Sequence, residues 1–416
     1  MSAAARGNTE RASRTAWFAL AVLTGINLFN YFDRYVVPAI QELLKSSPMH
    51  PTDEQLGLLS SAFFGAYMVF SLLVGAYGNR GHRPRLLGAG VAIWSIATVL
   101  GGFSTTFGQL LSSRAVVGIG EAVYATVGPA LLVDMFPLAM RGRVIAIFYA
   151  AMPVGAALGL GVSGVIAKAY GWPHAFFVAG VPGIVLAIAM WLVPEAKERS
   201  TSSEPVDLSG YISLLRNLPY VLIVLGLAAY TFGVGGTGVW LPSWLQRVRG
   251  LSTEKAAIMT GAVIALAGGA GSVVGGWVGD RFVGRWRESY LWVSAVSTLV
   301  AAPLALFAFL GPVPAYEVAM FAGVFFLFFS NGLVNTSILS VVPPPMRAAA
   351  MALSILVIHA LGDAPGPWII GKISDRSSLG EAMLVVPVAI LLGGLIWLYA
   401  AWRGERAPRP ATGATM

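Results

Sequence analysis

The sequence contains no cysteine and only four histidines among its 416 residues. Without cysteine, disulfide bonds and thiolate metal sites are excluded. The histidines are scattered, with neither a His-Glu-x-x-His pair nor a zinc-binding spacing. They are His50, His82, His174 and His359. We therefore expect neither a metal site nor a cofactor.

Charged residues are also scarce. They make up 11% of the chain, against about 25% in an ordinary globular protein. Hydrophobic residues make up 56%. Such a chain cannot cover a globular surface with ionised groups, so its composition excludes a soluble enzyme, a nucleic-acid-binding domain and a disordered chain. At about 20 apolar residues for each crossing, the chain has room for about twelve membrane helices.

Apolar runs bounded by Gly, Pro and charged clusters predict an all-α membrane protein with twelve transmembrane helices. The expected spans are 17–44, 54–78, 84–103, 106–134, 142–168, 174–193, 216–246, 253–280, 288–310, 314–341, 346–372 and 381–402. The one long polar connection, 194–213, lies at the chain midpoint and indicates a linker. The expected parts are a tail 1–16, a six-helix bundle 17–193, a linker 194–215, a second six-helix bundle 216–402 and a tail 403–416.

The net charge of +8 is explained by membrane topology rather than by a nucleic-acid partner. With the N-terminus placed in the cytoplasm, 18 of the 27 Lys and Arg fall in cytoplasmic segments and seven fall in outer segments. This asymmetry predicts that both termini are cytoplasmic. We expect no cleavable signal before Trp17. The short tails and compact loops are typical of a bacterial inner-membrane protein.

One short motif occurs twice, at the same position in each half. Gly75-Ala-Tyr-Gly-Asn79-Arg80 ends the second expected helix, and Gly276-Trp-Val-Gly-Asp280-Arg281 ends the eighth, 201 residues later. Repeated halves are the usual architecture of secondary transporters, which bind their substrate near the membrane midplane between the halves.

This pattern resembles the major facilitator superfamily, whose signature is a Gly-x-x-x-Asp-Arg loop between helices 2 and 3. The first copy has Asn79 in place of the aspartate, whereas the second copy keeps Asp280. Arg114 resembles the arginine of the superfamily's helix 4. The glycine-rich gate helix is represented by Gly155, Gly159 and Gly164. The resemblance covers nearly the whole chain and implies two six-helix bundles.

Four further segments resemble the spinster branch of the superfamily, which transports lysolipids and sphingolipids. They are Asn30–Arg34, Gly118–Ala122, His359–Asp363 and Gly371–Asp375. Bacterial organic-anion carriers share parts of these segments. The resemblance implies proton-coupled, alternating-access transport of an amphipathic lipid, such as a lysophospholipid or a sphingoid phosphate.

Five charged residues fall inside predicted helices. They are Asp33, Arg34, Arg114, Glu121 and Asp363. Each costs about 2.5–3.5 kcal/mol at the membrane centre, so such groups line a cavity or find a partner. The helix rise places Asp33, Arg114 and Glu121 in one depth band. The cluster predicts either a proton-carrying and anion-binding site or a structural ion network between helices 1 and 4.

Making and breaking a carboxylate–arginine pair can load and release a proton. Asp33 and Glu121 are therefore candidates for proton coupling. His359 and Asp363 are also candidates because they lie four residues apart on helix 11 and a histidine titrates near neutral pH. The alternative for this second pair is a structural hydrogen bond.

Arginine binds phosphate through two parallel hydrogen bonds. Helices 7 to 10 carry almost no internal charge, so one charged and one apolar half would suit a substrate with a polar head and an acyl tail. The substrate-binding candidates are Arg34, Arg114, Tyr67, Tyr124, Trp240, Phe329, Asn331 and Asn335. An aromatic stripe such as that of helix 10 more often marks lipid-facing or packing positions, and this is the alternative interpretation.

The gating candidates lie at expected cytoplasmic helix ends. They are Asn79, Arg80, Arg83, Asp134, Arg141, Arg143, Asp280 and Arg281. Asp134 with Arg141 and Arg143 predicts a salt bridge that locks a gate; the alternative is a solvated loop.

The sequence thus predicts a monomeric secondary active transporter in the cell membrane. Its expected partners are membrane lipids, an amphipathic lipid substrate and protons. A second hypothesis is a proton-linked carrier of drugs or small organic anions. A membrane-embedded enzyme, such as an acyltransferase, would need clustered catalytic residues, and only His359 and Asp363 are available. We therefore expect no enzymatic activity.

Overall fold

The computed structural model describes residues 13–77, 81–196, 208–283 and 285–406. Helices account for all of its regular secondary structure apart from one isolated bridge between Val283 and Trp286. Twelve helical segments are long and apolar enough to cross a membrane. Each expected span overlaps one of them, and no end differs by more than four residues. The structure thus confirms the twelve-helix membrane fold, whereas the side of the membrane that holds the termini stays a prediction.

The first six spans are built from seven helices. These are α2 (Arg14–Arg34), α3 (Val36–Lys45), α4 (Asp53–Tyr77), α5 (Arg83–Gly102), α6 (Phe107–Met135), α7 (Leu138–Tyr170) and α8 (Trp172–Trp191). Gly171 is the only residue between the last two helices. Its φ of 94° lies in the left-handed region that glycine adopts without steric cost.

The later spans contain more interruptions. The elements are α9 (Leu208–Arg216), α10 (Leu218–Arg247), α11 (Thr253–Ala262), the π-helix η2 (Val263–Gly268), α12 (Gly269–Phe282), α13 (Ser289–Leu310), α14 (Ala315–Phe328), α15 (Ser330–Ser340), the 3₁₀-helix η3 (Pro344–Met346), α16 (Arg347–Ile358), the π-helix η4 (His359–Asp363), α17 (Pro365–Arg376), α18 (Leu379–Ala382) and α19 (Val385–Arg406). The two π-helical turns fall inside the eighth and eleventh spans. Such turns are rare and occur frequently at functional sites.

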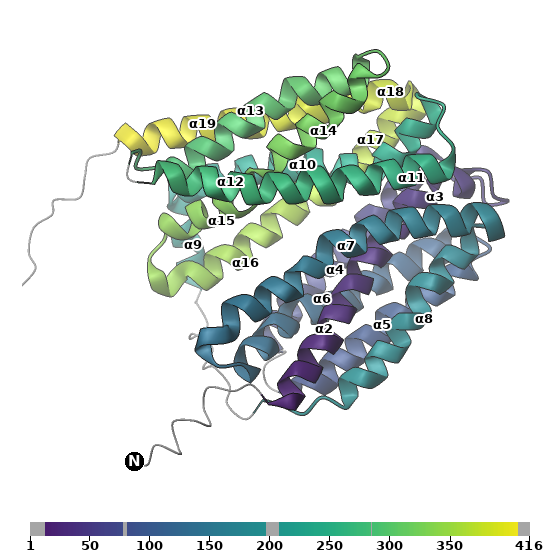
Figure 1. Ribbon diagram of the computed structural model, residues 1–416, viewed down its shortest axis with the longest axis horizontal. Helices are drawn as coiled ribbons and strands as arrows, with labels where there is room; N and C mark the ends of the chain where they lie inside the picture. Colours follow the sequence, from purple (N-terminus) through teal and green to yellow (C-terminus); the bar gives the residue numbers. More distant parts are fainter. Residues whose placement is uncertain (1–12, 78–80, 197–207, 284, 407–416) are drawn as a thin grey trace, which may run out of the picture. The chain divides into compact units, whose positions relative to one another are not determined.

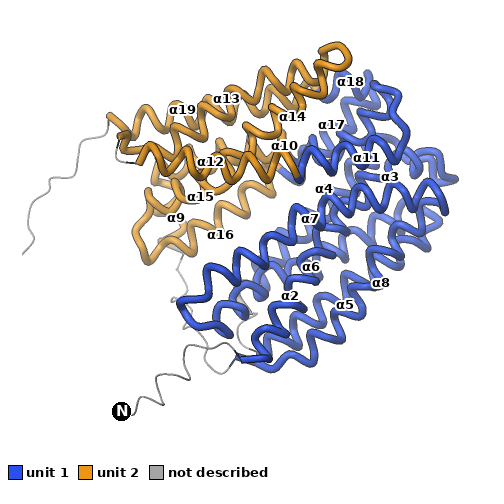
Figure 2. Tube along the Cα trace, in the orientation of Figure 1, with its two compact units in different colours: residues 1–202, 235–265, 363–383 blue, residues 203–234, 266–362, 384–416 orange. Residues whose placement is uncertain are grey.

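The chain divides into two compact units (Figure 2). Unit 1 comprises residues 1–202, 235–265 and 363–383, and unit 2 comprises residues 203–234, 266–362 and 384–416. The seventh, eighth, eleventh and twelfth spans therefore each pass from one unit into the other. The expected division into bundles 17–193 and 216–402 stays a prediction.

Unit 1 is held together by close helix packing. A Cβ atom on Gly118 of α6 would lie 2.3 Å from the Phe63 carbonyl oxygen of α4. On α7, a Cβ atom on Gly155 or Gly159 would lie 2.2 or 2.4 Å from a carbonyl oxygen of α2. These glycines allow backbones to approach where a side chain would not fit. In Figure 1, α2, α6 and α7 run alongside one another.

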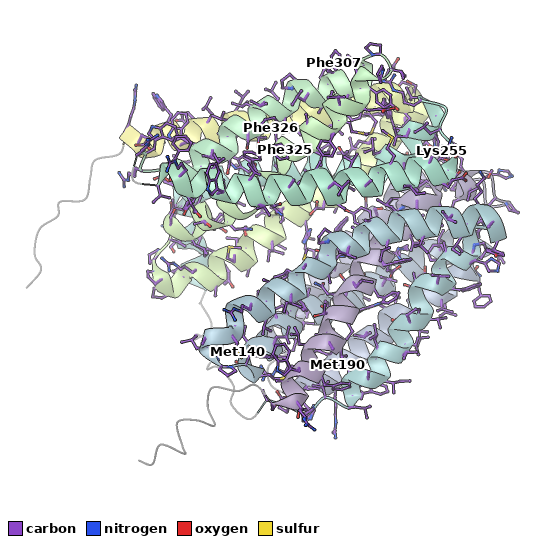
Figure 3. The ribbon with its side chains drawn as sticks, in the orientation of Figure 1. Met140, Met190, Lys255, Phe307, Phe325 and Phe326 are labelled. Carbon is purple, nitrogen blue, oxygen red and sulfur yellow. The ribbon has the colours of Figure 1, made fainter. Side chains whose placement is uncertain are left out.

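In unit 2, glycines of α12 allow similarly close helix packing. Three glycines spaced by four residues face α14 and α15. They are Gly271, Gly275 and Gly279. A Cβ atom on the first would lie 2.2 Å from the Phe325 carbonyl oxygen. Phe325 and its neighbour Phe326 project from α14 (Figure 3), and their rings are 5.4 Å apart.

The first span is broken where a single helix was expected. α2 ends at Arg34, Tyr35 has φ −100° and ψ 1°, and α3 begins at Val36. Pro38 explains the break because it has no N–H to donate to the carbonyl of Arg34, four residues earlier. Asp33 and Arg34 therefore lie in the last turn of a helix rather than in the middle of one.

Candidate functional site

The charged residues of the first and fourth spans form two buried ion pairs. Arg34 Nε lies 2.8 Å from Glu121 Oε2, and Arg114 Nη1 lies 3.0 Å from Asp33 Oδ1. Each pair joins α2 to α6, and each helix supplies one acid and one base. We call these four residues the central charge cluster. The structure brings together the four residues expected to meet, and the roles assigned to them stay predictions.

The Asp33–Arg114 pair is almost completely shielded from solvent, with side-chain exposures of 1% and 3%. Thr98 of α5 donates a second hydrogen bond to Asp33, from Oγ1 to Oδ2 at 2.6 Å. Both carboxylate oxygens therefore have a partner. Isolated charges are very costly to bury, and pairing with additional hydrogen bonds offsets that cost. Both charges of this pair are therefore compensated within the protein.

The Arg34–Glu121 pair is less completely satisfied. The side chain of Arg34 is 17% exposed, whereas Glu121 is fully buried. Within the described residues, two buried polar atoms lack a hydrogen-bond partner here. They are Glu121 Oε1 and the side-chain nitrogen Nδ2 of Asn30, which lies in α2 one turn before Arg34. Unsatisfied buried polar atoms are uncommon and mark sites of chemistry or bound water. The Arg34–Glu121 pair is thus the more accessible and the less completely hydrogen-bonded half of the cluster.

Aromatic rings surround the guanidinium of Arg34. Its Cζ lies 4.9 Å from the ring centre of Tyr31, 5.2 Å from that of Phe63 and 5.3 Å from that of Tyr67. Phe63 also lies 5.7 Å from Arg114 Cζ, so both arginines contact one ring. Cation–π contacts attract a guanidinium without consuming its hydrogen-bond donors. These three rings therefore hold the Arg34 guanidinium in position beside Glu121.

The two tyrosines predicted to bind substrate have different surroundings. Tyr67 is half-buried beside Arg34, at the edge of the cluster. Tyr124 is 2% exposed, donates a hydrogen bond to the Leu23 carbonyl at 3.1 Å and packs edge-on against Trp94. The position of Tyr124 is that of a packing residue between α2 and α6.

A second network lies at the start of α5. Arg83 is 3% exposed and pairs with Asp134 at 2.7 Å and with Glu195 at 2.8 Å. The ion pair of Asp134 is therefore made with Arg83. Arg141 Nε donates to the Phe136 carbonyl at 3.1 Å, and Arg143 is exposed. The locking salt bridge from Asp134 to these two arginines stays a prediction, as does the gating role. Asn79 and Arg80 lie outside the described residues.

A third network was not anticipated from the sequence. Asp53, at the start of α4, is 2% exposed and accepts from Arg247 of α10, Lys45 of α3 and Ser374 of α17. Arg247 also donates to Glu42 of α3, at 2.9 Å from each oxygen. All of these residues belong to unit 1. We call these five residues the Asp53 network.

The neighbouring Asp375 caps the same helix. Its two carboxylate oxygens accept from the backbone N–H groups of Asp53, at 2.9 Å, and Glu54, at 2.8 Å. A carboxylate at a helix N-terminus satisfies free donors and complements the helix dipole. Gly371 permits the approach because a Cβ atom there would lie 2.2 Å from the Asp53 carbonyl oxygen. The Gly-x-x-x-Asp spacing of residues 371–375 was the available sequence signal.

Comparison with known proteins identifies the fold. The model of the Major Facilitator Superfamily matches residues 23–367. The chain belongs to this superfamily. It is 32% identical to spinster homolog 1 of Homo sapiens over 86% of this chain and 72% of that protein. It is also 30% identical to a sphingosine-1-phosphate transporter of Xenopus tropicalis over 93% of this chain and 82% of that protein.

The chain therefore belongs to the spinster family of transporters, and it is a transporter rather than an enzyme. It is 32% identical to spinster of Drosophila melanogaster but spans only 62% of that protein's length. The crystal structure of a bacterial homolog of the human lysosomal transporter spinster, described as inward-facing and unoccupied, superposes with a TM-score of 0.84 at 21% identity. That alignment covers 96% of this chain and all of the other.

The remaining substrate candidates of this transporter are spread over both units. Trp240 is fully buried in unit 1 and donates from Nε1 to the Pro367 carbonyl at 2.9 Å, which ties α10 to α17. In unit 2, Phe329 is 8% exposed and packs in a cluster with Val293 and Leu333. Both aromatic residues thus have the surroundings of packing residues.

The two asparagines of α15 are exposed on one face. Asn335 Nδ2 donates to the Asn331 carbonyl at 3.2 Å. Polar side chains on a membrane helix rarely face lipid and usually face water or a cavity. Their predicted role in substrate binding stays a prediction.

His359 and Asp363 begin and end the π-helix η4, and both are half-buried. A Cβ atom on Gly235 of α10 would lie 2.9 Å from Asp363 Oδ1, so the carboxylate lies against the α10 backbone. Their proposed proton-coupling role stays a prediction.

The second copy of the loop motif lies in unit 2. Asp280 Oδ1 accepts from the Tyr290 hydroxyl at 2.9 Å, which joins the end of α12 to the start of α13. Arg281 is exposed. The gating role of both residues also stays a prediction. Within the described residues, no group of three or more His, Asp or Glu side chains could hold a metal ion.

Proposed function

We propose that this spinster-family transporter moves an amphipathic lipid with an anionic headgroup, such as a lysophospholipid or a sphingoid phosphate, and that protonation of a buried carboxylate promotes binding of this substrate. The observation that carries the proposal is the Arg34–Glu121 pair, in which a partly exposed guanidinium is held by a carboxylate with one unpartnered oxygen. The relative from Xenopus tropicalis is a sphingosine-1-phosphate transporter, which supports the same substrate class.

The chemistry of this pair provides a simple coupling step. While Glu121 is ionised, Oε2 occupies the Nε donor of Arg34. A proton delivered to the carboxylate removes its charge, so the attraction to the guanidinium falls. Arg34 can then bind phosphate oxygens through two parallel hydrogen bonds, while Tyr31, Phe63 and Tyr67 keep the group in place. Proton binding and substrate binding would thereby be linked at one arginine.

The more deeply buried pair is assigned a different role. Asp33 and Arg114 are both satisfied and shielded, so they hold α2 against α6. In this proposal Arg34 binds the headgroup and Glu121 carries the proton. Asp33 holds the end of α2, next to the break at Tyr35, in place against α6. The apolar chain of the substrate would need an apolar surface, which the exposed valines, leucines and phenylalanines of the membrane helices offer in abundance.

Transport in proteoliposomes tests the proposal. Uptake of a labelled lysophospholipid and of a labelled sphingoid phosphate is measured with and without an imposed pH gradient. We expect the gradient to accelerate uptake by the wild-type protein and to have no effect on Glu121→Gln. Glu381→Gln removes an exposed carboxylate instead and should retain full acceleration. Unchanged proton-driven uptake by Glu121→Gln would overturn the coupling step.

The substrate class is tested by competition. Excess unlabelled lysophospholipid or sphingoid phosphate should suppress uptake, and a small organic anion without an acyl chain should not. Arg34→Lys keeps the charge but loses the planar donor pair, so we expect its KM to rise about tenfold, the effect of one lost charge-assisted hydrogen bond. Competition by small anions or drugs with none by the lipids would favour the alternative of an organic-anion carrier.

A further inference from the structure

Five arginines gather at one end of unit 2, where neither the central charge cluster nor the Asp53 network lies. The arginine patch consists of Arg281, Arg285, Arg287, Arg403 and Arg406. The first three belong to the end of α12 and the connection to α13, and the last two belong to the end of α19. All five side chains are exposed.

These two segments are brought together although they lie more than a hundred residues apart. The backbone N–H of Glu288 donates to Glu405 Oε1 at 3.0 Å. A Cβ atom on Gly404 would lie 2.6 Å from Glu288 Cγ, so the Glu288 side chain packs closely against the backbone of Gly404. Figure 1 shows α12 and α19 ending at the same end of unit 2. The patch is therefore one surface rather than two.

The nearby carboxylates are already occupied. Residues 280–288 and 403–406 carry five arginines and three carboxylates, a net charge of +2. Asp280 accepts from Tyr290, and Glu405 accepts from the backbone of Glu288. Burial of Glu288 and the charge of Glu405 raise the pKa of Glu288, and Arg287 opposes that effect. Within the described residues, no ion pair is made by Arg281, Arg285, Arg403 or Arg406.

Aromatic side chains accompany the arginines. Trp286 is 45% exposed and stacks on Phe282 at 4.8 Å with the planes 12° apart. Trp402 is 43% exposed and lies 4.0 Å from the Arg406 guanidinium carbon. Exposed tryptophans favour the level of the lipid headgroups because their rings have both apolar and polar character. The patch therefore lies where phosphate groups of the bilayer are available.

We infer that the arginine patch is a binding surface for phospholipids with a net negative headgroup, seated on the ends of α12 and α19. Guanidinium groups bind phosphate oxygens bidentately, which a lysine patch would not do equally well. The tryptophans would contact the glycerol and upper acyl region of the same lipids. This inference concerns lipids that surround the protein and does not depend on the identity of the transported substrate.

Native mass spectrometry of the purified full-length protein tests this inference. The protein is titrated with a phospholipid of negative headgroup and, separately, with a zwitterionic phospholipid of the same acyl chains. We expect the anionic lipid to bind more tightly. Each arginine near a membrane surface strengthens such binding about fivefold, so Arg285→Gln combined with Arg403→Gln should weaken it about 25-fold. Equal binding of the two lipids by the wild type would overturn the inference.

Arg216→Gln is the matched control. Arg216 is an exposed arginine of unit 2 at the end of α9, without the aromatic cluster. We expect its lipid binding to equal that of the wild type. A loss of about fivefold in this single-charge control would show that each arginine contributes equally wherever it lies, which would attribute the effect to net charge and overturn the assignment of a site. Displacement of the bound lipid by millimolar inorganic phosphate would assign the patch to a free anion instead. Melting curves verify that each variant is folded.

Discussion

At the scale of single residues, the two arginines of the central charge cluster differ in their freedom. Arg114 is enclosed and faces a carboxylate that is fully satisfied, whereas Arg34 is partly exposed and faces a carboxylate with a free oxygen. In the mechanism proposed above, the same ion-pair chemistry therefore serves two purposes. A pair that is sealed from solvent fixes two helices, and a pair that is open at one edge can exchange its partner for a ligand.

The sealed pair predicts a characteristic pattern in a double-mutant cycle. Arg114→Gln alone leaves the buried charge of Asp33 without its ion-pair partner. Loss of one partner of a buried pair lowers the free energy of unfolding by about 3–5 kcal/mol. Asp33→Asn alone leaves the buried charge of Arg114 unpaired in the same way. The double variant removes both charges, so we expect it to unfold at a higher temperature than either single variant. Thermal unfolding in detergent measures this.

Arg143→Gln provides the baseline for that cycle because Arg143 is exposed. It should leave the unfolding temperature within error of the wild type. Additive losses in the double variant would show that Asp33 and Arg114 act independently, contrary to the ion pair.

At the scale of elements, glycines decide how closely α7 can pack. Gly159 faces the Phe32 carbonyl, directly before Asp33, so the position of α7 controls the backbone that carries the central charge cluster. The break between α2 and α3 at Tyr35 lies in the same region. Helix packing and the placement of the charges are thus parts of one arrangement.

Gly159→Ala should consequently damage both stability and transport. Its Cβ atom would lie 2.4 Å from the Phe32 carbonyl oxygen, so a backbone must shift. Such overpacking costs about 1–3 kcal/mol. Gly142→Ala, on the same helix, meets nothing within 4 Å and should be neutral or slightly stabilising, since alanine favours helix. Melting temperatures and uptake rates compare the two; equal behaviour would argue against a close approach of α7 to α2.

At the scale of the whole molecule, the Asp53 network joins segments that are far apart in the sequence. It links α3 and α4 to α10 and α17 through one buried carboxylate, and all of these segments lie within unit 1. We expect these contacts to stabilise the arrangement of helices in which they form. Removing the carboxylate leaves Arg247 and Lys45 without this partner, which makes the tied arrangement less stable.

The absence of cysteine makes this tie measurable. A single Gly238→Cys substitution fits, because a Cβ atom there meets only the Tyr35 ring at 3.7 Å, and it lies about 13 Å along α10 from Arg247. In this background we expect Asp53→Asn to accelerate labelling by a water-soluble maleimide at least about tenfold, given the cost of breaking a buried pair. Glu381→Gln should not change the rate. A rate unaffected by Asp53→Asn would show that the network does not restrict access.

The sequence by itself determined the number and limits of the membrane helices and the identity of the charges that they bury. Both follow from local chemistry: an apolar run of sufficient length must cross the bilayer as a helix, and a charge inside it must be paired or hydrated. The candidates Asp33, Arg34, Arg114 and Glu121 could therefore be found without coordinates.

Only the tertiary structure decided which charge meets which. Helical periodicity could show that Asp33 and Arg34 point in different directions, but not that one selects Arg114 and the other Glu121. The Asp53 network was missed for the same reason, since Lys45, Asp53 and Arg247 each resemble ordinary charges at helix ends. Partner choice across 81 to 322 residues of chain depends on helix packing, and no local pattern records it.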